Sequence, residues 1–288
     1  MTTMTSKPAT ARWRGSTAGR AGTPIAWGAL ARRVGTATAV LTVSLTLLIL
    51  TWAATSAAFG LPFLFPGPGD VAQAFVSAVE NGKLLTAVQA SLGRIAAGFA
   101  IGCSLGIVLG LVLGASPVLR EVASPLVTFF RFVPPLAWFA PALVLFGAGE
   151  ASMIALIVYT SVFVVAMSTL EGGARVSLDL QRMAGVAGAS WWQRLAWVTL
   201  PASLPYVFAG MRIAMGNAFM TVVSAEMLGA SAGLGVIVNT GMISTRIPDV
   251  FVAIAALGIL GLAFDRLFVL LINTVGRRFR EQAGSAVA

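Results

Sequence analysis

The feature that most constrains the fold is a series of long apolar runs separated by short polar segments. Only 10% of the 288 residues are charged, whereas about 25% is usual in soluble domains, and the mean hydropathy is +0.91. An apolar run of about 20 residues is long enough to cross the bilayer as a helix, which satisfies its own backbone polar groups in lipid. The sequence therefore predicts an all-α, polytopic membrane protein.

We expect six transmembrane helices. Five lie at residues 38–59, about 87–115, 152–170, 206–228 and 250–275, and one contains the prolines between 125 and 141. The first run is longer than the apolar core of an ordinary signal peptide, so we expect it to remain as a membrane helix. The remaining parts are a basic disordered tail at 1–37, an external loop with a surface helix at 60–86, a core at 87–276 and a tail at 277–288.

The basic residues indicate the orientation of these helices. With both termini inside, thirteen Lys and Arg residues fall in internal segments and only Lys83 and Arg246 fall in external loops. This excess on one side is the positive-inside pattern, and it predicts cytoplasmic termini and a cytoplasmic segment at 171–203. The net charge of +9 then reflects orientation, and we expect no nucleic-acid partner.

The lack of certain residue types excludes several kinds of chemistry. The chain has no histidine and a single cysteine, Cys103. Histidine metal sites, Ser-His catalysis and an intramolecular disulfide are therefore excluded, and we expect no metal site.

The polar segment at 171–203 has the marks of a helical turn. Ser190 and Gln193 have the spacing of a capping box. Gly188 can take the positive φ that ends a helix, and Pro201 closes the run. We expect two short helices joined at Gly188, outside the bilayer, where they are suited to docking a cytoplasmic partner.

The second apolar run carries a glycine at every fourth position. Such glycines form one ridge along a helix and allow another backbone to approach closely in lipid. We expect this ridge to pack against a neighbouring helix; general enrichment of glycine in membrane helices is the alternative. The residues are Gly98, Gly102, Gly106, Gly110 and Gly114.

Pro134 and Pro135 interrupt the third run, because a Pro-Pro pair removes two backbone donors. Freed carbonyls at membrane depth are tolerated where protein or a water-filled cavity receives them. The segment from Arg131 to Trp138 is therefore a candidate lining of a path through the membrane. A kink needed only for packing is the alternative.

Several charged residues lie within the apolar runs. We expect Arg94 and Arg212, near span ends, to extend toward the interface. Glu226 is about 21 Å from Arg212 along one helix, too far to pair with it. Glu226 either pairs with an arginine of another helix or lines the external mouth of the path.

The 182–201 segment resembles the cytoplasmic motif of the inner-membrane permease subunits of binding-protein-dependent ABC importers. That motif reads Glu-Ala-Ala, three residues, Gly, nine residues, an aliphatic residue, one residue, Leu-Pro. Arg and Met replace its first two positions here. The matching residues are Arg182, Met183, Ala184, Gly188, Val198, Leu200 and Pro201.

Within that family, residues 87–275 are similar to the taurine/nitrate/sulfonate branch and most like its taurine-type permease. The similar stretches are residues 91–94, 131–138, 146–150, 188–190, 200–205, 210–213 and 225–226.

The resemblance implies a mechanism. Two permease subunits, generally identical in this branch, form the pore in the inner membrane, and a binding protein delivers a small solute, such as a sulfonate. Two cytoplasmic ATPases receive coupling helices within about 177–200, where Ser190 and Trp192 lie. The chain contains no Gly-x4-Gly-Lys-Ser/Thr loop. We therefore expect ATP and Mg on a separate subunit and no cofactor or catalytic residue here.

Two other functions stay open on the sequence. A secondary transporter driven by an ion gradient would need carboxylates at mid-membrane, and Glu226 and Asp265 are the candidates. A membrane enzyme is disfavoured by the lack of histidine and of clustered carboxylates.

Overall fold

The computed structural model describes residues 27–61 and 64–285, and every element in that part of the chain is helical. The predicted all-α class is confirmed. In the described residues, five helices are long and apolar enough to cross a membrane, and a bent pair of helices makes a sixth span if it is counted as one. Helix α1 (Trp27–Phe59) begins before residue 38, and the rest of the predicted tail lies outside the described residues.

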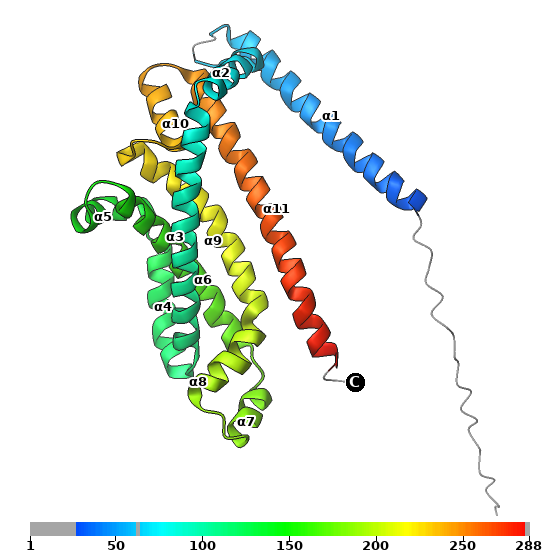
Figure 1. Ribbon diagram of the computed structural model, residues 1–288, viewed down its shortest axis with the longest axis vertical. Helices are drawn as coiled ribbons and strands as arrows, with labels where there is room; N and C mark the ends of the chain where they lie inside the picture. Colours follow the sequence, from blue (N-terminus) through cyan, green and yellow to red (C-terminus); the bar gives the residue numbers. More distant parts are fainter. Residues whose placement is uncertain (1–26, 62–63, 286–288) are drawn as a thin grey trace, which may run out of the picture. The chain divides into compact units, whose positions relative to one another are not determined.

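The chain divides into two units, residues 1–51 and 52–288. In the second unit, α6 (Glu150–Ala174) packs between α3 (Lys83–Gly114) and α9 (Leu200–Gly229) (Figure 1). The buried side chains that join the three helices include Ile95, Ile157 and Val222. This three-helix core positions every feature described below.

The glycine ridge of α3 lies against α6. A Cβ atom added at Gly98, Gly102, Gly106 or Gly110 would come within 2.5–2.8 Å of an α6 atom, closer than real contacts allow. At Gly114 the nearest atom would be 3.6 Å away, an ordinary contact. The first four glycines thus set the short distance between the two helices, and in lipid this close packing substitutes for the hydrophobic effect.

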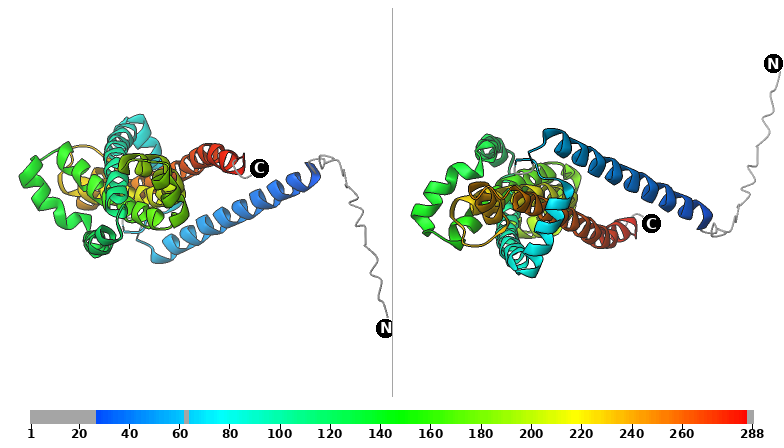
Figure 2. Two further views of the ribbon diagram at one scale, coloured as in Figure 1. Left: turned by 90° about the horizontal axis from the view of Figure 1, so that it is seen from below. Right: turned by 90° about the horizontal axis from the view of Figure 1, so that it is seen from above.

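The third predicted span is broken. Helix α4 (Pro117–Phe132) is followed by the short 3-10 turn η1 (Pro135–Trp138) and by α5 (Phe139–Phe146), and the chain bends by 87° between them. Figure 2 shows from both ends of the molecule that α4 and α5 lie on the opposite side of the core from α11 (Ile247–Ser285).

The polar segment before α9 contains the two expected short helices on either side of Gly188, but the second is not separate from α9. Helix α7 (Leu178–Val186) ends before Gly188, as expected. By contrast, α8 (Trp191–Arg194) continues through a π-helical turn, η2 (Leu195–Thr199), into α9. The expectation that Pro201 closes the run is wrong, because the wider π turn directly before it accommodates a residue without a backbone N–H.

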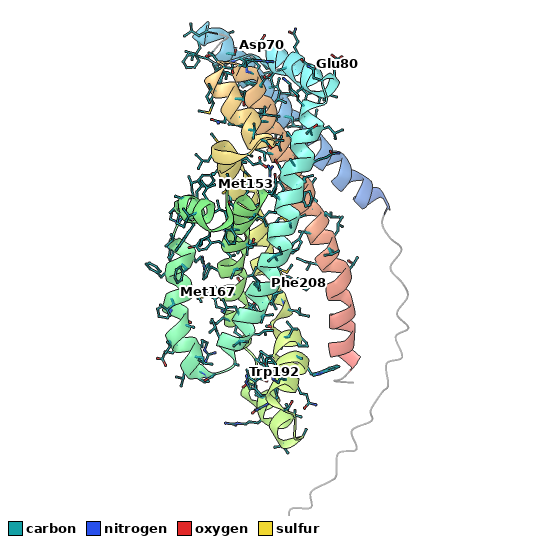
Figure 3. All side chains as sticks on the ribbon, turned by 60° about the vertical axis from the view of Figure 1, so that its left-hand side comes forward. Asp70, Glu80, Met153, Met167, Trp192 and Phe208 are labelled. Carbon is teal, nitrogen blue, oxygen red and sulfur yellow. The ribbon has the colours of Figure 1, made fainter. Side chains whose placement is uncertain are left out.

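The opposite end of this unit carries the remaining helices. The predicted loop at 60–86 contains α2 (Pro68–Glu80), and α10 (Leu234–Ile243) follows α9. Figure 3 places Asp70 and Glu80 at this end and Trp192 at the other. The predicted tail at 277–288 is a continuation of α11 up to Ser285.

Candidate functional site

The break after α4 has a direct cause in the sequence. The carbonyl of Phe130 would accept a helical bond from residue 134, but Pro134 has no N–H. Two other donors take its place: the Val133 backbone N–H at 3.2 Å and the Tyr159 hydroxyl of α6 at 2.6 Å. The bent span is therefore fixed to the core by a hydrogen bond to the carbonyl that the proline leaves free.

A cavity of about 310 Å³ lies beside the break, between α4, α6 and α9. Arg131 and Pro135 line it on one side and Asn217 and Thr221 on the other. The hydroxyls of Thr160 and Thr221 are buried and lie 3.0 Å apart. Among the described residues, neither Arg131 nor Asn217 has a side-chain hydrogen bond or an acidic partner; Arg131 lies over the Phe132 ring.

The other predicted path residues lie elsewhere. The ring of Trp138 packs 5.6 Å from that of Tyr159, and neither Trp138 nor Pro134 contributes to the cavity lining. Glu226 is fully buried among protein groups and lines none of the cavities described here. Its placement on the path is therefore corrected: the structure supports the other possibility, a pair with an arginine of a different helix.

That arginine is Arg94, and the expectation that Arg94 extends toward the interface is wrong. Its side chain is only 3% exposed. One guanidinium nitrogen lies 2.6 Å from a Glu226 oxygen and donates to the Ala232 carbonyl at 2.6 Å, while Nε donates to Glu150 at 2.6 Å. A second ion pair joins Arg94 Nη2 to Glu150. A buried charge needs such complete pairing, because an isolated one is strongly destabilising.

The carboxylate of Glu226 is equally well satisfied. Ser91 donates to both of its oxygens at 2.8 and 2.9 Å, and the Gly235 backbone N–H donates to Oε2 at 2.8 Å. Gly233, with φ of +146°, leaves no room for a side chain, since a Cβ there would lie 2.3 Å from the carboxylate carbon. We call the side chains of Ser91, Arg94, Glu150 and Glu226 the Arg94 network.

The Arg94 network joins α3, the start of α6, the end of α9 and the start of α10. Its members Ser91 and Glu150 were not anticipated as functional residues. One signal was available: Ser91 and Arg94 are three residues apart on a helix, so they share a face, and that face is otherwise apolar. The sequence could not show that α6 and α9 each place a carboxylate, Glu150 and Glu226, within hydrogen-bonding distance of Arg94.

The segment around α7 and α8 is built as a rigid, exposed turn. Gly188 has φ of +74°, and the Ala189 N–H bonds back to the Ala184 carbonyl at 3.0 Å. Ser190 and Gln193 form the predicted capping box, with the Ser190 N–H 2.7 Å from the Gln193 side-chain oxygen. Around this turn, large apolar side chains point outward: Met183, Val186 and Trp192 are 67%, 92% and 69% exposed.

The residues that match the permease motif begin in this turn and continue into η2 and α9. Arg182 lies 3.9 Å from Asp179 on α7, with both side chains exposed. Val198 belongs to η2, and Leu200 and Pro201 begin α9. The motif therefore runs from the exposed turn directly into a core helix.

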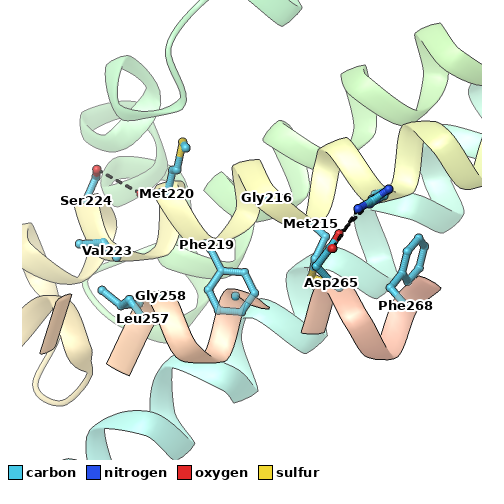
Figure 4. Close-up of a pocket in the computed structure, with 12 residues that line it drawn as sticks. Met215, Gly216, Phe219, Met220, Val223, Ser224, Leu257, Gly258, Asp265 and Phe268 are labelled. Atoms are coloured by element: carbon cyan, nitrogen blue, oxygen red, sulfur yellow. Dashed lines mark hydrogen bonds and ion pairs between the residues drawn. The ribbon is translucent and has the colours of Figure 1, made fainter. Parts of the chain in front are cut away.

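A second cavity, of about 590 Å³, lies between α9 and α11 (Figure 4). Its lining is mostly apolar, with Phe219 and Leu257 among the residues, and Arg212 pairs with Asp265 at 2.6 Å. Both carboxylates that an ion-driven transporter would use, Glu226 and Asp265, are thus neutralised by arginine. In the described residues, no group of three or more His, Cys, Asp or Glu side chains could hold a metal ion.

Comparison with known proteins identifies close relatives of this chain. It is 37% identical over 204 residues to a probable ABC transporter permease protein of Brucella melitensis, which covers 71% of this chain and 83% of the relative. It is 34% identical over 178 residues to the bicarbonate transport system permease protein CmpB of Synechococcus elongatus (62% and 64% covered). It is 31% identical over 186 residues to the nitrate import permease protein NrtB of Synechocystis (65% and 68% covered).

Solved structures share the fold. A methionine ABC transporter, MetNI, in inward-facing conformations gives a TM-score of 0.59 at 21% identity, covering 68% of this chain and 95% of that one. A bacterial alginate ABC transporter in complex with its periplasmic protein gives 0.58 at 15% identity, covering 88% and 97%. Residues 102–281, more than half of the chain, match the family of binding-protein-dependent transport system inner membrane components. The chain belongs to this family and is the membrane-spanning permease subunit of an ABC importer.

Proposed function

We propose that this permease imports a small anion, that two copies of it form the pore, and that each copy is driven by a separate ATPase through the α7–α8 turn. The anion is supported by the nitrate and bicarbonate named for two relatives. It is also supported by Arg131, a cation without an acidic partner among the described residues beside a cavity. A sulfonate, including the sulfonate group of taurine, is an oxyanion like nitrate and bicarbonate.

The observation that carries the coupling proposal is the exposed turn itself. Met183, Val186 and Trp192 form a patch of exposed, large apolar side chains around the turn. Such patches are rare on surfaces that face only water, so we interpret this one as a docking surface. The positive-inside pattern supports a cytoplasmic position for this turn. Because Gly188 and the Ser190 cap hold the turn in one conformation, movement of a docked motor is passed to α9 without being absorbed by a flexible loop.

The first experiment tests all three parts of this proposal. The tagged chain, purified in mild detergent, is expected to bring down an ATPase and a second copy of itself. Reconstituted with that ATPase and the binding protein, the complex is expected to accumulate nitrate, bicarbonate or a sulfonate only when ATP is present. Uptake by the chain alone under an ion gradient would refute the proposal and support a secondary transporter.

The second experiment addresses coupling through Gly188. A β-branched residue cannot adopt φ of +74° without a cost of about 1–3 kcal/mol, so Gly188→Val should distort the turn. We expect uptake to fall about tenfold or more while ATP hydrolysis persists. Gly258→Val is the control, since a Cβ at Gly258 on α11 meets no atom within 4 Å. Wild-type uptake by Gly188→Val would contradict the docking role.

A further inference from the structure

The cavity beside the broken span has the composition of an anion site. Helix α4 has 16 residues and is about 24 Å long, shorter than the roughly 30 Å hydrocarbon core of a bilayer, so its end at Arg131 lies at membrane depth. A charged residue there should face protein partners or a water-filled space. Within the described residues Arg131 has no acidic partner, and it lines a cavity of about 310 Å³.

One further polar group of this cavity, the amide of Asn217, can donate hydrogen bonds to a ligand. Asn217 carries an amide without a hydrogen-bond partner among the described residues. Thr160 donates to the Leu156 carbonyl at 3.1 Å, so in the 3.0 Å bond between the two hydroxyls Thr221 donates to Thr160 and has no proton left for a ligand. In the part of the chain that the structure describes, no carboxylate lines the cavity, and Arg131 gives it a formal charge of +1.

The broken helix makes Arg131 essential for an anion here. The C-terminal end of α4 carries the negative pole of the helix dipole, which repels an anion. Arg131 offsets that repulsion, and its planar fork of N–H donors fits an oxyanion through two parallel hydrogen bonds. A water molecule takes about 30 Å³ in the liquid, so the cavity holds about ten waters, enough space for a small anion with part of its hydration shell.

We infer that the cavity between α4, α6 and α9 is a binding site for a small oxyanion within the membrane, held by Arg131 with Asn217. The permease would then select negatively charged cargo itself, in addition to the selection by its binding protein. This inference rests on the proposed anion import and adds the location and the groups that bind.

The inference is tested by protecting a thiol in the cavity. Cys103 is the sole cysteine and is buried, so a cysteine placed at Ile213, an exposed apolar lining residue, reports on the cavity. The ATPase complex carrying Ile213→Cys is labelled with a neutral maleimide. Because the reagent has no charge, its labelling rate is not changed by the ionic strength of the added salts. Nitrate and ethanesulfonate are added in parallel as the probe anions.

We expect the anion that the complex imports to slow labelling about tenfold at about ten times its half-saturating concentration. The matched control is Ser224→Cys in the α9–α11 cavity, which the anion should not protect. Arg131→Gln should abolish protection and raise the half-saturating concentration for uptake about tenfold or more. Arg131→Lys, which keeps the charge but loses the fork, should retain part of the protection.

A second variant guards against a folding defect in Arg131→Gln. Asn217→Asp has the same shape but adds a negative charge, and it should abolish protection with normal yield of the complex. Two outcomes would refute the site while the proposed function stands, provided that the complex imports nitrate or ethanesulfonate. In the first, the imported anion does not protect Ile213→Cys. In the second, protection stays intact in Arg131→Gln and Asn217→Asp. If uptake assays show import of uncharged solutes only, anion import fails, and the site fails with it.

Discussion

Arg94 shows how strongly one residue can depend on its surroundings. In the sequence it is a basic residue near the end of an apolar run, and an interfacial position is the ordinary outcome. In the structure its guanidinium binds Glu226, Glu150 and the Ala232 carbonyl. The partners come from three other parts of the chain, so local pattern could not identify them. The possibility of an arginine partner for Glu226 was foreseen; its identity was not.

The Arg94 network leads to a stability prediction. Arg94→Ala leaves the Glu226 carboxylate fully buried without its cation, and we expect a loss of about 3–5 kcal/mol in stability. Thermal unfolding in detergent and the yield of the complex measure this. Arg246→Ala is the control, because its pair with Asp249 is largely exposed and should contribute at most about 1 kcal/mol. Equal unfolding temperatures for the two variants would show that the network is not structural.

The glycine ridge leads to a second residue-level prediction. Gly106→Leu should prevent assembly, because even its Cβ would come 2.8 Å from the Val162 carbonyl oxygen of α6. Gly93→Leu, on the same helix, should assemble normally, since a Cβ there meets no atom within 4 Å. Size-exclusion chromatography of the complex distinguishes these outcomes, and normal assembly of Gly106→Leu would contradict the packing described.

At the scale of elements, sequence reasoning located helices better than it located their ends. The Pro-Pro break was predicted from the lost donors, and it lies where α4 meets η1. The continuity of α8, η2 and α9 was missed, because proline is usually read as a terminator and a π turn has no recognisable residue pattern. The side chain that compensates the break, Tyr159, could not be predicted, since it comes from a different helix.

The bond from Tyr159 gives a prediction for the bent element. Tyr159→Phe removes the hydroxyl that serves the Phe130 carbonyl and should cost about 1 kcal/mol. In a Pro134→Ala background the backbone N–H at 134 can serve that carbonyl instead, so the same change should cost less. Thermal unfolding of the two single variants and the double variant measures the coupling. Strictly additive losses would show that the hydroxyl does not compensate for the proline.

At the scale of the whole molecule, composition and charge were enough to predict an all-α membrane protein, because the apolar runs permit little else. Orientation stays a prediction, made from the thirteen basic residues assigned to one side and the two assigned to the other. Neither pattern reveals how helices pair, which depends on contacts such as those of the glycines with α6.

Orientation is directly testable. With Cys103 replaced by alanine, Ser190→Cys should react with a membrane-impermeant maleimide only when the cytoplasmic face is open to the reagent. Asn81→Cys, between α2 and α3 at the opposite end, should react from the outside. Labelling of Ser190→Cys in intact cells would show that the predicted orientation is wrong, and it would remove the basis for a cytoplasmic motor.

The unbroken helical path from Trp191 to Gly229 has a mechanical consequence. Its 39 residues extend about 58 Å, and its two ends carry the exposed turn and the carboxylate that binds Arg94. A rod of this length that tilts by about 10° around its middle shifts both tips by about 5 Å in opposite directions. With the proposed pore and motor, such a seesaw would narrow the pore on one face of the membrane as it widens it on the other, so a single stroke of the motor would exchange the two openings.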